Sequence, residues 1–90
     1  MLPKISNYGN YSNDNYGAHT LQVEFDKFTL YYSYETIVAF ADEKGLVCSE
    51  NVWGKTTGKH LNWINPDKKE RVKYAIFETL LKEMLERRTQ

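Results

Sequence analysis

The sequence has one cysteine, no excess of either charge and no long apolar run, and each of these absences excludes a class of protein. Cys48 has no partner within the chain, so the fold is not a disulfide-bonded secreted scaffold. Twelve basic side chains balance twelve acidic ones, which argues against non-specific nucleic-acid binding and against a DNA mimic. No apolar stretch approaches the roughly 20 residues of a membrane-spanning helix. Residues 1–15 lack the pattern of a signal peptide, so we expect a cytoplasmic protein.

What the chain does have is a large share of aromatic residues in a short length. Ninety residues allow one domain, and such a short chain buries only about two-thirds of its unfolded surface. Seven Tyr, four Phe and two Trp supply large buried areas per residue and so help to build a dense core. A homodimer would add further buried surface, and the composition leaves that state open.

The first 17 residues differ in composition from the rest of the chain. Asn, Ser and Gly dominate residues 6–17 and favour turns, and Tyr8, Tyr11 and Tyr16 interrupt them. We expect a flexible Tyr/Asn-rich arm over residues 1–17 and a single α+β domain over residues 18–90. Alternatively, the tyrosines of the arm dock on a partner or stack on bases.

Alternating apolar and polar residues predict four strands. Residues 19–25 and 28–33 alternate with period two, residues 36–41 are nearly all apolar, and residues 46–50 complete the set. Short links separate them, and Gly45 supplies a positive φ to the last turn. These features predict a small antiparallel β-meander sheet of about four strands, packed by one C-terminal α-helix, in a two-layer α+β domain.

The C-terminal helix has the strongest periodicity in the chain. Its apolar stripe comprises Ile76, Phe77, Leu80, Leu81, Met84 and Leu85. Its start has two interpretations: either Asn65-Pro66-Asp67 is an N-cap, or residues 67–73 form a basic connector and the helix begins near Tyr74. We favour the connector, because the stripe is weak before Val72.

Residues 51–64 are the most informative segment, because they mix Trp, Gly, Lys, Thr and His without a clean strand or helix period. This mixture indicates a shaped loop, the usual location of binding chemistry. A short helix from Thr57 to Ile64, capped by Thr57, is the alternative and would accept an anion at its N-terminus. Together with two tyrosines of the second strand and the turn after it, the segment supplies the candidate binding residues, which are Trp53, Lys55, Thr57, Lys59, His60, Trp63, Tyr31 and Tyr34.

No complete catalytic or metal-binding motif is present. Residues 54–60 fail the Walker pattern, since the spacing of the glycines is too short and His60 follows Lys59. The spacing of His19, Cys48 and His60 fits no zinc motif, and Cys48 fits a buried apolar role on its strand. We therefore expect no metal, no cofactor and no enzymatic activity.

Part of the chain resembles a known family. The resemblance covers residues 19–64. It rests on Ala18-His19-Thr20-Leu21, Leu30-Tyr31-Tyr32-Ser33-Tyr34, Ala39-Phe40 and Gly45-Leu46-Val47, and above all on Glu50-Asn51-Val52-Trp53-Gly54 with Thr56-Thr57-Gly58-Lys59-His60-Leu61-Asn62-Trp63-Ile64. The chain is similar here to a family of small uncharacterised prokaryotic and phage domains. The resemblance implies a phage or mobile-element setting, in the host cytoplasm, and no activity or site.

Three functional hypotheses follow. We favour a small non-catalytic binding module, an accessory protein that binds a host or viral protein through Trp53 or Trp63, with Lys55, Lys59 and His60 at the rim. The alternative is single-stranded nucleic-acid binding through tyrosine stacking and the lysines, joined by the basic run at residues 68–73. A hydrolytic or phosphoryl-directed enzyme using Lys59 and His60 is the third, and it requires a pocket that holds both side chains beside a carboxylate.

Overall fold

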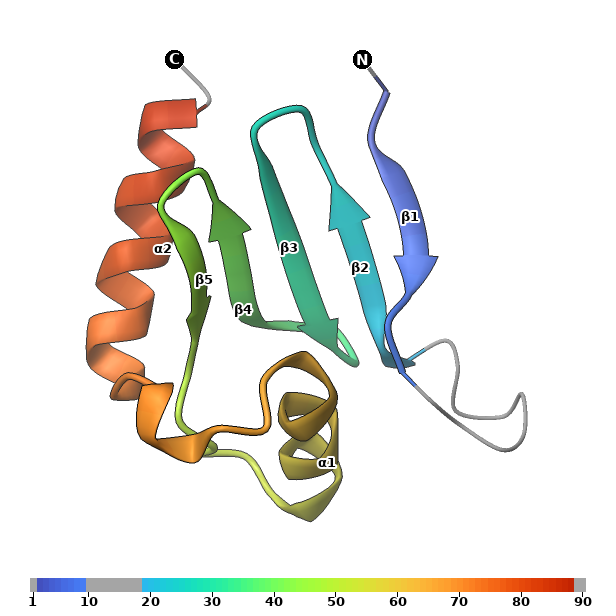
Figure 1. The fold of residues 1–90 in the computed structure, drawn as a ribbon, viewed down its shortest axis with the longest axis vertical. Coiled ribbons are helices and arrows are strands. Elements are labelled where there is room, and N and C mark those ends of the chain that lie inside the picture. Colours follow the sequence, from blue (N-terminus) through green and yellow to red (C-terminus); the bar gives the residue numbers. More distant parts are fainter. Residues whose placement is uncertain (1, 10–18, 89–90) are drawn as a thin grey trace.

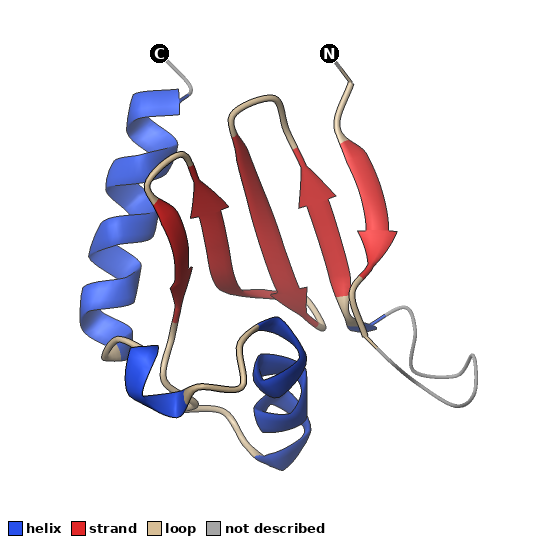
Figure 2. Ribbon diagram, viewed as in Figure 1, coloured by secondary structure: helices blue, strands red, loops and turns tan. Residues whose placement is uncertain are grey.

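The computed structural model describes residues 2–9 and 19–88, which form a sheet and the helices that pack on it (Figures 1 and 2). The elements, in chain order, are β1 (Lys4–Asn7), β2 (Leu21–Glu24), β3 (Phe28–Ser33), β4 (Thr36–Asp42), β5 (Gly45–Cys48), α1 (Lys55–Ile64), the 3-10 helix η2 (Lys68–Glu70) and α2 (Tyr74–Arg88).

The sheet is an antiparallel meander. Its strands stand in the order β1-β2-β3-β4-β5, and every neighbouring pair is antiparallel. The prediction of an α+β fold with a meander and a C-terminal helix is therefore confirmed, with five strands in place of about four. In the last hairpin Gly45 has a φ of 119°, the positive value expected for this turn.

Strand β1 is the addition that the sequence did not predict. We expected folded structure to begin near Ala18, yet Lys4–Asn7 pairs with β2 at one edge of the sheet. All four residues of β1 are exposed and only Ile5 is strongly apolar, so the alternation that marks a half-buried strand is missing. The remainder of the expected arm, residues 10–17, lies outside the described residues.

Two clusters of buried side chains stabilise the two faces of the sheet. On one face Phe77 and Met84 of α2 pack against Leu30 and Phe40. On the other face Leu61 of α1 packs in a second cluster, whose strand members are Val38, Ala39 and Cys48. The neighbours Ala39 and Phe40 belong to different clusters because successive side chains of a strand point to opposite faces. Cys48 is buried, as its expected role on a strand requires.

A β-bulge in β4 shapes the end of the sheet that receives α1. Tyr31 pairs with Ala39 and Tyr32 pairs with Ile37, so Val38 is the extra residue. A bulge redirects side chains locally, and here Val38 joins Ala39 in the cluster beneath α1. Figure 1 shows α1 at this end of the sheet, where β3 ends and β4 begins.

Residues 55–64 form a helix rather than the loop that we favoured. This segment has few apolar residues, but the side chains of Thr57, His60 and Leu61 are all buried and lie on one face of the helix at helical spacing. Our alternative placed a short helix here with Thr57 as its cap, but the N-cap is Gly54 and makes no side-chain cap. Two of the three buried residues are polar, so a hydrophobicity pattern does not reveal this face.

The connector before α2 has the predicted form. Helix α2 begins at Tyr74, and the residues before it contain η2, in which the Asp67 side chain accepts a hydrogen bond from the Lys69 amide. Val72 adds to the end of β5, since its N–H donates to the Cys48 carbonyl at 2.9 Å. This pairing fixes the connector beside α1 and brings the two most basic segments of the chain together.

Candidate functional site

Helix α1 presents two different faces, and the candidate residues divide between them. Thr57 and His60 point into the protein, and His60 has an exposed fraction of 0%. Lys55 and Lys59 are exposed, on the side that faces η2 and the connector. The expectation of His60 at the rim of a contact surface is therefore wrong, because helical periodicity turns it towards the sheet.

A buried polar network joins α1 to β3. The Ser33 hydroxyl lies 2.6 Å from His60 Nδ1 and 3.0 Å from Thr57 Oγ1. Ser33 is only 2% exposed, so the network is shielded from water. Burial lowers the pKa of His60, and the neighbouring His19 lowers it further. The network therefore links α1 to the end of β3, in surroundings that disfavour a charged imidazole.

Four rings continue outward from this network, and we call His19, Tyr34, His60 and Trp63 the ring column. The ring centroids of His19 and Tyr34 are 4.3 Å apart, those of Tyr34 and His60 are 5.7 Å apart, and His60 stacks on Trp63 at 5.7 Å. Tyr34 is 44% exposed, whereas His60 is fully covered. The column thus connects a buried helix anchor to an aromatic surface at the β3–β4 turn.

Tyr31 does not share that surface. Its ring packs against the cluster beneath α1 and meets Tyr8 edge-on, with centroids 5.7 Å apart. Burial raises the pKa of Tyr31, and the charge of Glu24 adds to this effect. Tyr31 is therefore part of the packing of the sheet face, and of the two candidate tyrosines Tyr34 is the one available for contact.

The exposed lysines of α1 belong to a groove formed by three segments, which we call the basic groove. Its volume is about 720 Å³, and its lining residues are Glu50, Asn51, Lys55, Gly58, Lys59, Asn62, Lys68, Arg71 and Lys73. Five of these nine side chains are cationic and one is anionic. The anion, Glu50, accepts a hydrogen bond from the Tyr74 amide at 3.0 Å and so stabilises the start of α2.

Two contacts hold the walls of the basic groove together. Arg71 Nη2 donates to Asn62 Oδ1 at 2.9 Å and to the Asn65 carbonyl at 3.3 Å, which ties the connector to α1. Gly58 permits a close approach on the other side, since an added Cβ would lie 2.9 Å from Asn51 Nδ2. The backbone segments that carry the cations are therefore held in place relative to one another.

Trp53 stands apart from the ring column. It lies in the loop before α1, is 36% exposed and meets Tyr74 edge-on at 5.4 Å. Val52 beside it is also exposed. The two tryptophans of the segment therefore serve different surfaces, Trp63 in the ring column and Trp53 against the first turn of α2.

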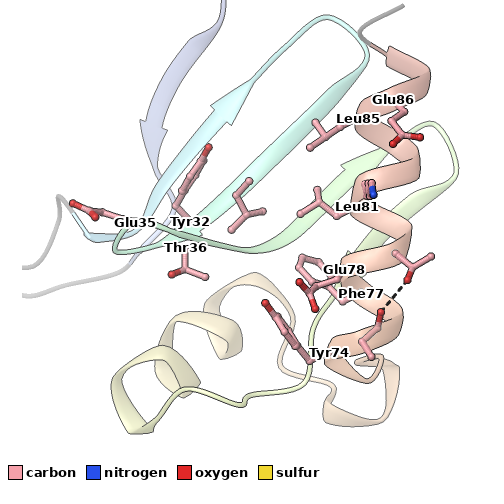
Figure 3. Close-up of a pocket in the computed structure, with 13 residues that line it drawn as sticks. Tyr32, Glu35, Thr36, Tyr74, Phe77, Glu78, Leu81, Leu85 and Glu86 are labelled. Carbon is pink, nitrogen blue, oxygen red and sulfur yellow. Dashed lines mark hydrogen bonds between the residues drawn. The ribbon is translucent and has the colours of Figure 1, made fainter.

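A second concavity lies between α2 and the sheet and differs from the basic groove in chemistry. Its volume is about 820 Å³, and Figure 3 shows Tyr32, Leu81 and Leu85 along it. Glu35, Glu78 and Glu86 also line it. This concavity is largely apolar, and its charged lining residues are three carboxylates and one cation, Lys82, whereas cations predominate in the basic groove.

The geometry also bears on the other hypotheses. Lys59 lines the basic groove with Glu50, but His60 faces the sheet, so the described residues do not form the pocket that the enzyme hypothesis requires. Within residues 2–9 and 19–88, no three His, Cys, Asp or Glu side chains gather in a group that could hold a metal ion. None of the helices described is long and apolar enough to cross a membrane.

The comparisons with known proteins define the class of this chain. Residues 3–79 match the sequence model described as "Family of unknown function (DUF8033)". The chain belongs to this family, which confirms the resemblance to an uncharacterised domain family. We found no match among curated proteins and none among solved structures.

Sequence reasoning missed two residues of the site. His19 was weighed only as a metal ligand, and Ser33 was named only as part of the tyrosine-rich strand and turn. Both take part through contacts between segments far apart in the chain, such as the pairing of Ser33 with His60. No local pattern in the sequence reports such contacts.

Proposed function

We propose that this protein binds a nucleic-acid strand by its phosphates in the basic groove. The observation that carries the proposal is the gathering of Lys55, Lys59, Lys68, Arg71 and Lys73 in one groove around a single carboxylate. Phosphate neutralisation by Lys and Arg supplies most of the affinity of sequence-independent nucleic-acid binding.

Charge segregation reconciles this proposal with the neutral net charge. Residues 55–73 hold six of the twelve basic side chains of the chain but only two of its twelve acidic ones. Two of the remaining carboxylates, Glu78 and Glu86, lie on α2 along the apolar concavity, and Glu35 lines it as well. Local charge, rather than net charge, therefore determines where a polyanion is attracted.

The residue types favour backbone recognition over sequence readout. Four of the five cations are lysines, which act as mobile point charges and do not impose the bidentate geometry of base contacts. Arg71 uses one guanidinium nitrogen to bind Asn62 and Asn65, so it is the one cation held in a fixed position. Such a groove positions phosphates and reads little sequence.

The test is the salt dependence of binding to labelled oligonucleotides, measured by fluorescence anisotropy. The variant Lys55→Gln/Lys59→Gln removes two cations of the basic groove. We expect it to bind more weakly and to reduce the slope of log K against log salt by up to roughly 1.4 to 1.8, because each lost phosphate contact removes about 0.7 to 0.9.

A matched control has the same change in net charge at another place. Lys27 and Lys44 lie in the β2–β3 and β4–β5 turns, and Figure 1 shows both turns at the end of the sheet opposite α1. Lys27→Gln/Lys44→Gln should leave the slope nearly unchanged. Equal weakening by both double variants, or no binding by the wild type at low salt, would refute the proposal.

A second candidate function is the protein-binding module, and the exposed apolar pair Val52 and Trp53 favours it. The partner would be a host or viral protein, in keeping with a phage or mobile-element accessory protein in the host cytoplasm. A protein retained after nuclease treatment by the wild type but lost with Trp53→Ala would support this function. If the wild type and the Trp53→Ala variant retained the partner equally, Trp53 would be rejected as the anchor.

A further inference from the structure

We propose that the exposed ring of Tyr34, at the surface of the ring column, stacks an unpaired base, which makes single-stranded nucleic acid the ligand. This inference rests on the proposed function and extends it from phosphate contacts to the class of nucleic acid. Its basis is separate from the basic groove: the backbone of Tyr34, the support beneath its ring and the position of that ring relative to α1.

The backbone of Tyr34 adopts a conformation that favours other residues. Its φ is 57°, and among the described residues it is the one non-glycine residue with a positive φ. Glycine or asparagine adopts this conformation at lower cost. The Tyr34 amide also donates to the His19 carbonyl at 2.8 Å, which fixes the turn. A bulky ring at such a position indicates that the ring itself is required there.

The support beneath Tyr34 gives the ring a fixed orientation. The His19 ring packs against it with centroids 4.3 Å apart and a tilt of 31°, and the ring of the buried His60, held by Ser33, lies 5.7 Å away. A hollow of about 550 Å³ opens beside the rings, and its lining residues are His19, Leu21, Tyr34, Glu35 and Thr36. A base can stack on a ring that is already ordered without the cost of ordering it.

Helix α1 links the ring column to the charge of the basic groove. Trp63, the last member of the ring column, follows Lys59 by four residues, and residues at this spacing are neighbours on a helix. Lys59 in turn lines the basic groove. A strand with its phosphates at Lys59 therefore passes beside the rings, where an unstacked base of a single strand can reach them. The bases of a duplex are paired and stacked inside it.

The experiment compares three probes on the intact chain: a labelled 12-nucleotide strand, its duplex, and a strand of equal length with abasic linkers. We expect the wild type to prefer the single strand over both others. The variant Tyr34→Asn removes the ring but tolerates a positive φ, so the fold should persist, as far-UV circular dichroism would check. It should weaken single-strand binding roughly 5- to 150-fold and leave the salt slope unchanged.

Tyr34→Phe keeps the ring and should retain the affinity of the wild type. The outcomes separate the inference from the proposed function. Lysine-dependent binding that is equal for the single strand, the abasic strand and the duplex, and unaffected by Tyr34→Asn, would overturn base stacking and leave the function of the basic groove standing. Absence of binding to all three probes would overturn both.

Discussion

Replacing Ser33 with alanine tests whether the buried network holds α1 to the sheet. The substitution removes an oxygen that lies 2.6 Å from His60 Nδ1 and 3.0 Å from Thr57 Oγ1. Ser33 is 2% exposed and His60 0%, so bulk water does not replace the lost hydroxyl. Loss of one partner of a buried polar group costs about 1–3 kcal/mol. For a domain of this size, the melting temperature should fall by roughly 4 to 24 °C.

The measurement is urea unfolding at pH 8, where His60 is neutral in both states, monitored by tryptophan fluorescence and circular dichroism. Ser6→Ala is the matched control, because it makes the same change on the exposed strand β1. We expect the control to change the free energy of unfolding by less than about 0.5 kcal/mol. A loss of stability in Ser33→Ala no larger than that of the control would show that the network contributes little and would refute the reasoning.

Two further predictions concern the same helix. Burial, with His19 nearby, lowers the pKa of His60, so below about pH 6.5 the unfolded chain binds a proton that the folded chain resists. The stability that neutral His60 contributes should therefore be fully present above that pH and decline as the pH falls. His60→Asn should flatten this dependence of the unfolding free energy between pH 8 and pH 5, and an unchanged slope would contradict the prediction. Gly58→Ala should not gain the roughly 1 kcal/mol expected in a helix, because the new Cβ would lie 2.9 Å from Asn51 Nδ2. The same change in an Asn51→Ala background should be more favourable by about 0.5 kcal/mol or more in a double-mutant cycle, and strict additivity would argue against the contact.

The elements that the sequence predicts well are those whose residues carry a clear period. The strand at residues 28–33 matches β3, and the helix start near Tyr74 matches α2. In both, apolar side chains recur at the spacing of the element because they pack in the cluster around Phe77. Strand β1 lacks this signal, since its pairing to β2 uses backbone groups and buries none of its side chains.

The candidate site was predictable in its components and not in its arrangement. The lysines of the segment from 55 to 59 and the basic run that follows were both recognised as charged. The pairing of Val72 with β5 and the Arg71 contacts to Asn62 and Asn65 bring the connector to α1. Likewise, Tyr34 was recognised as a contact residue, whereas the rings that support it come from residues 19 and 60. Such placements depend on tertiary contacts and leave no trace in local spacing.

Helix α1 explains why residues 51–64 look irregular in sequence. Thr57, His60 and Leu61 face the sheet, and Lys55 and Lys59 face the basic groove. Buried residues and exposed cations therefore alternate along one helix. The inward set is partly polar because it completes the network with Ser33 rather than a purely apolar core. The mixture that indicated a loop is therefore the expected composition of a helix that fixes an aromatic surface on one side and presents charge on the other.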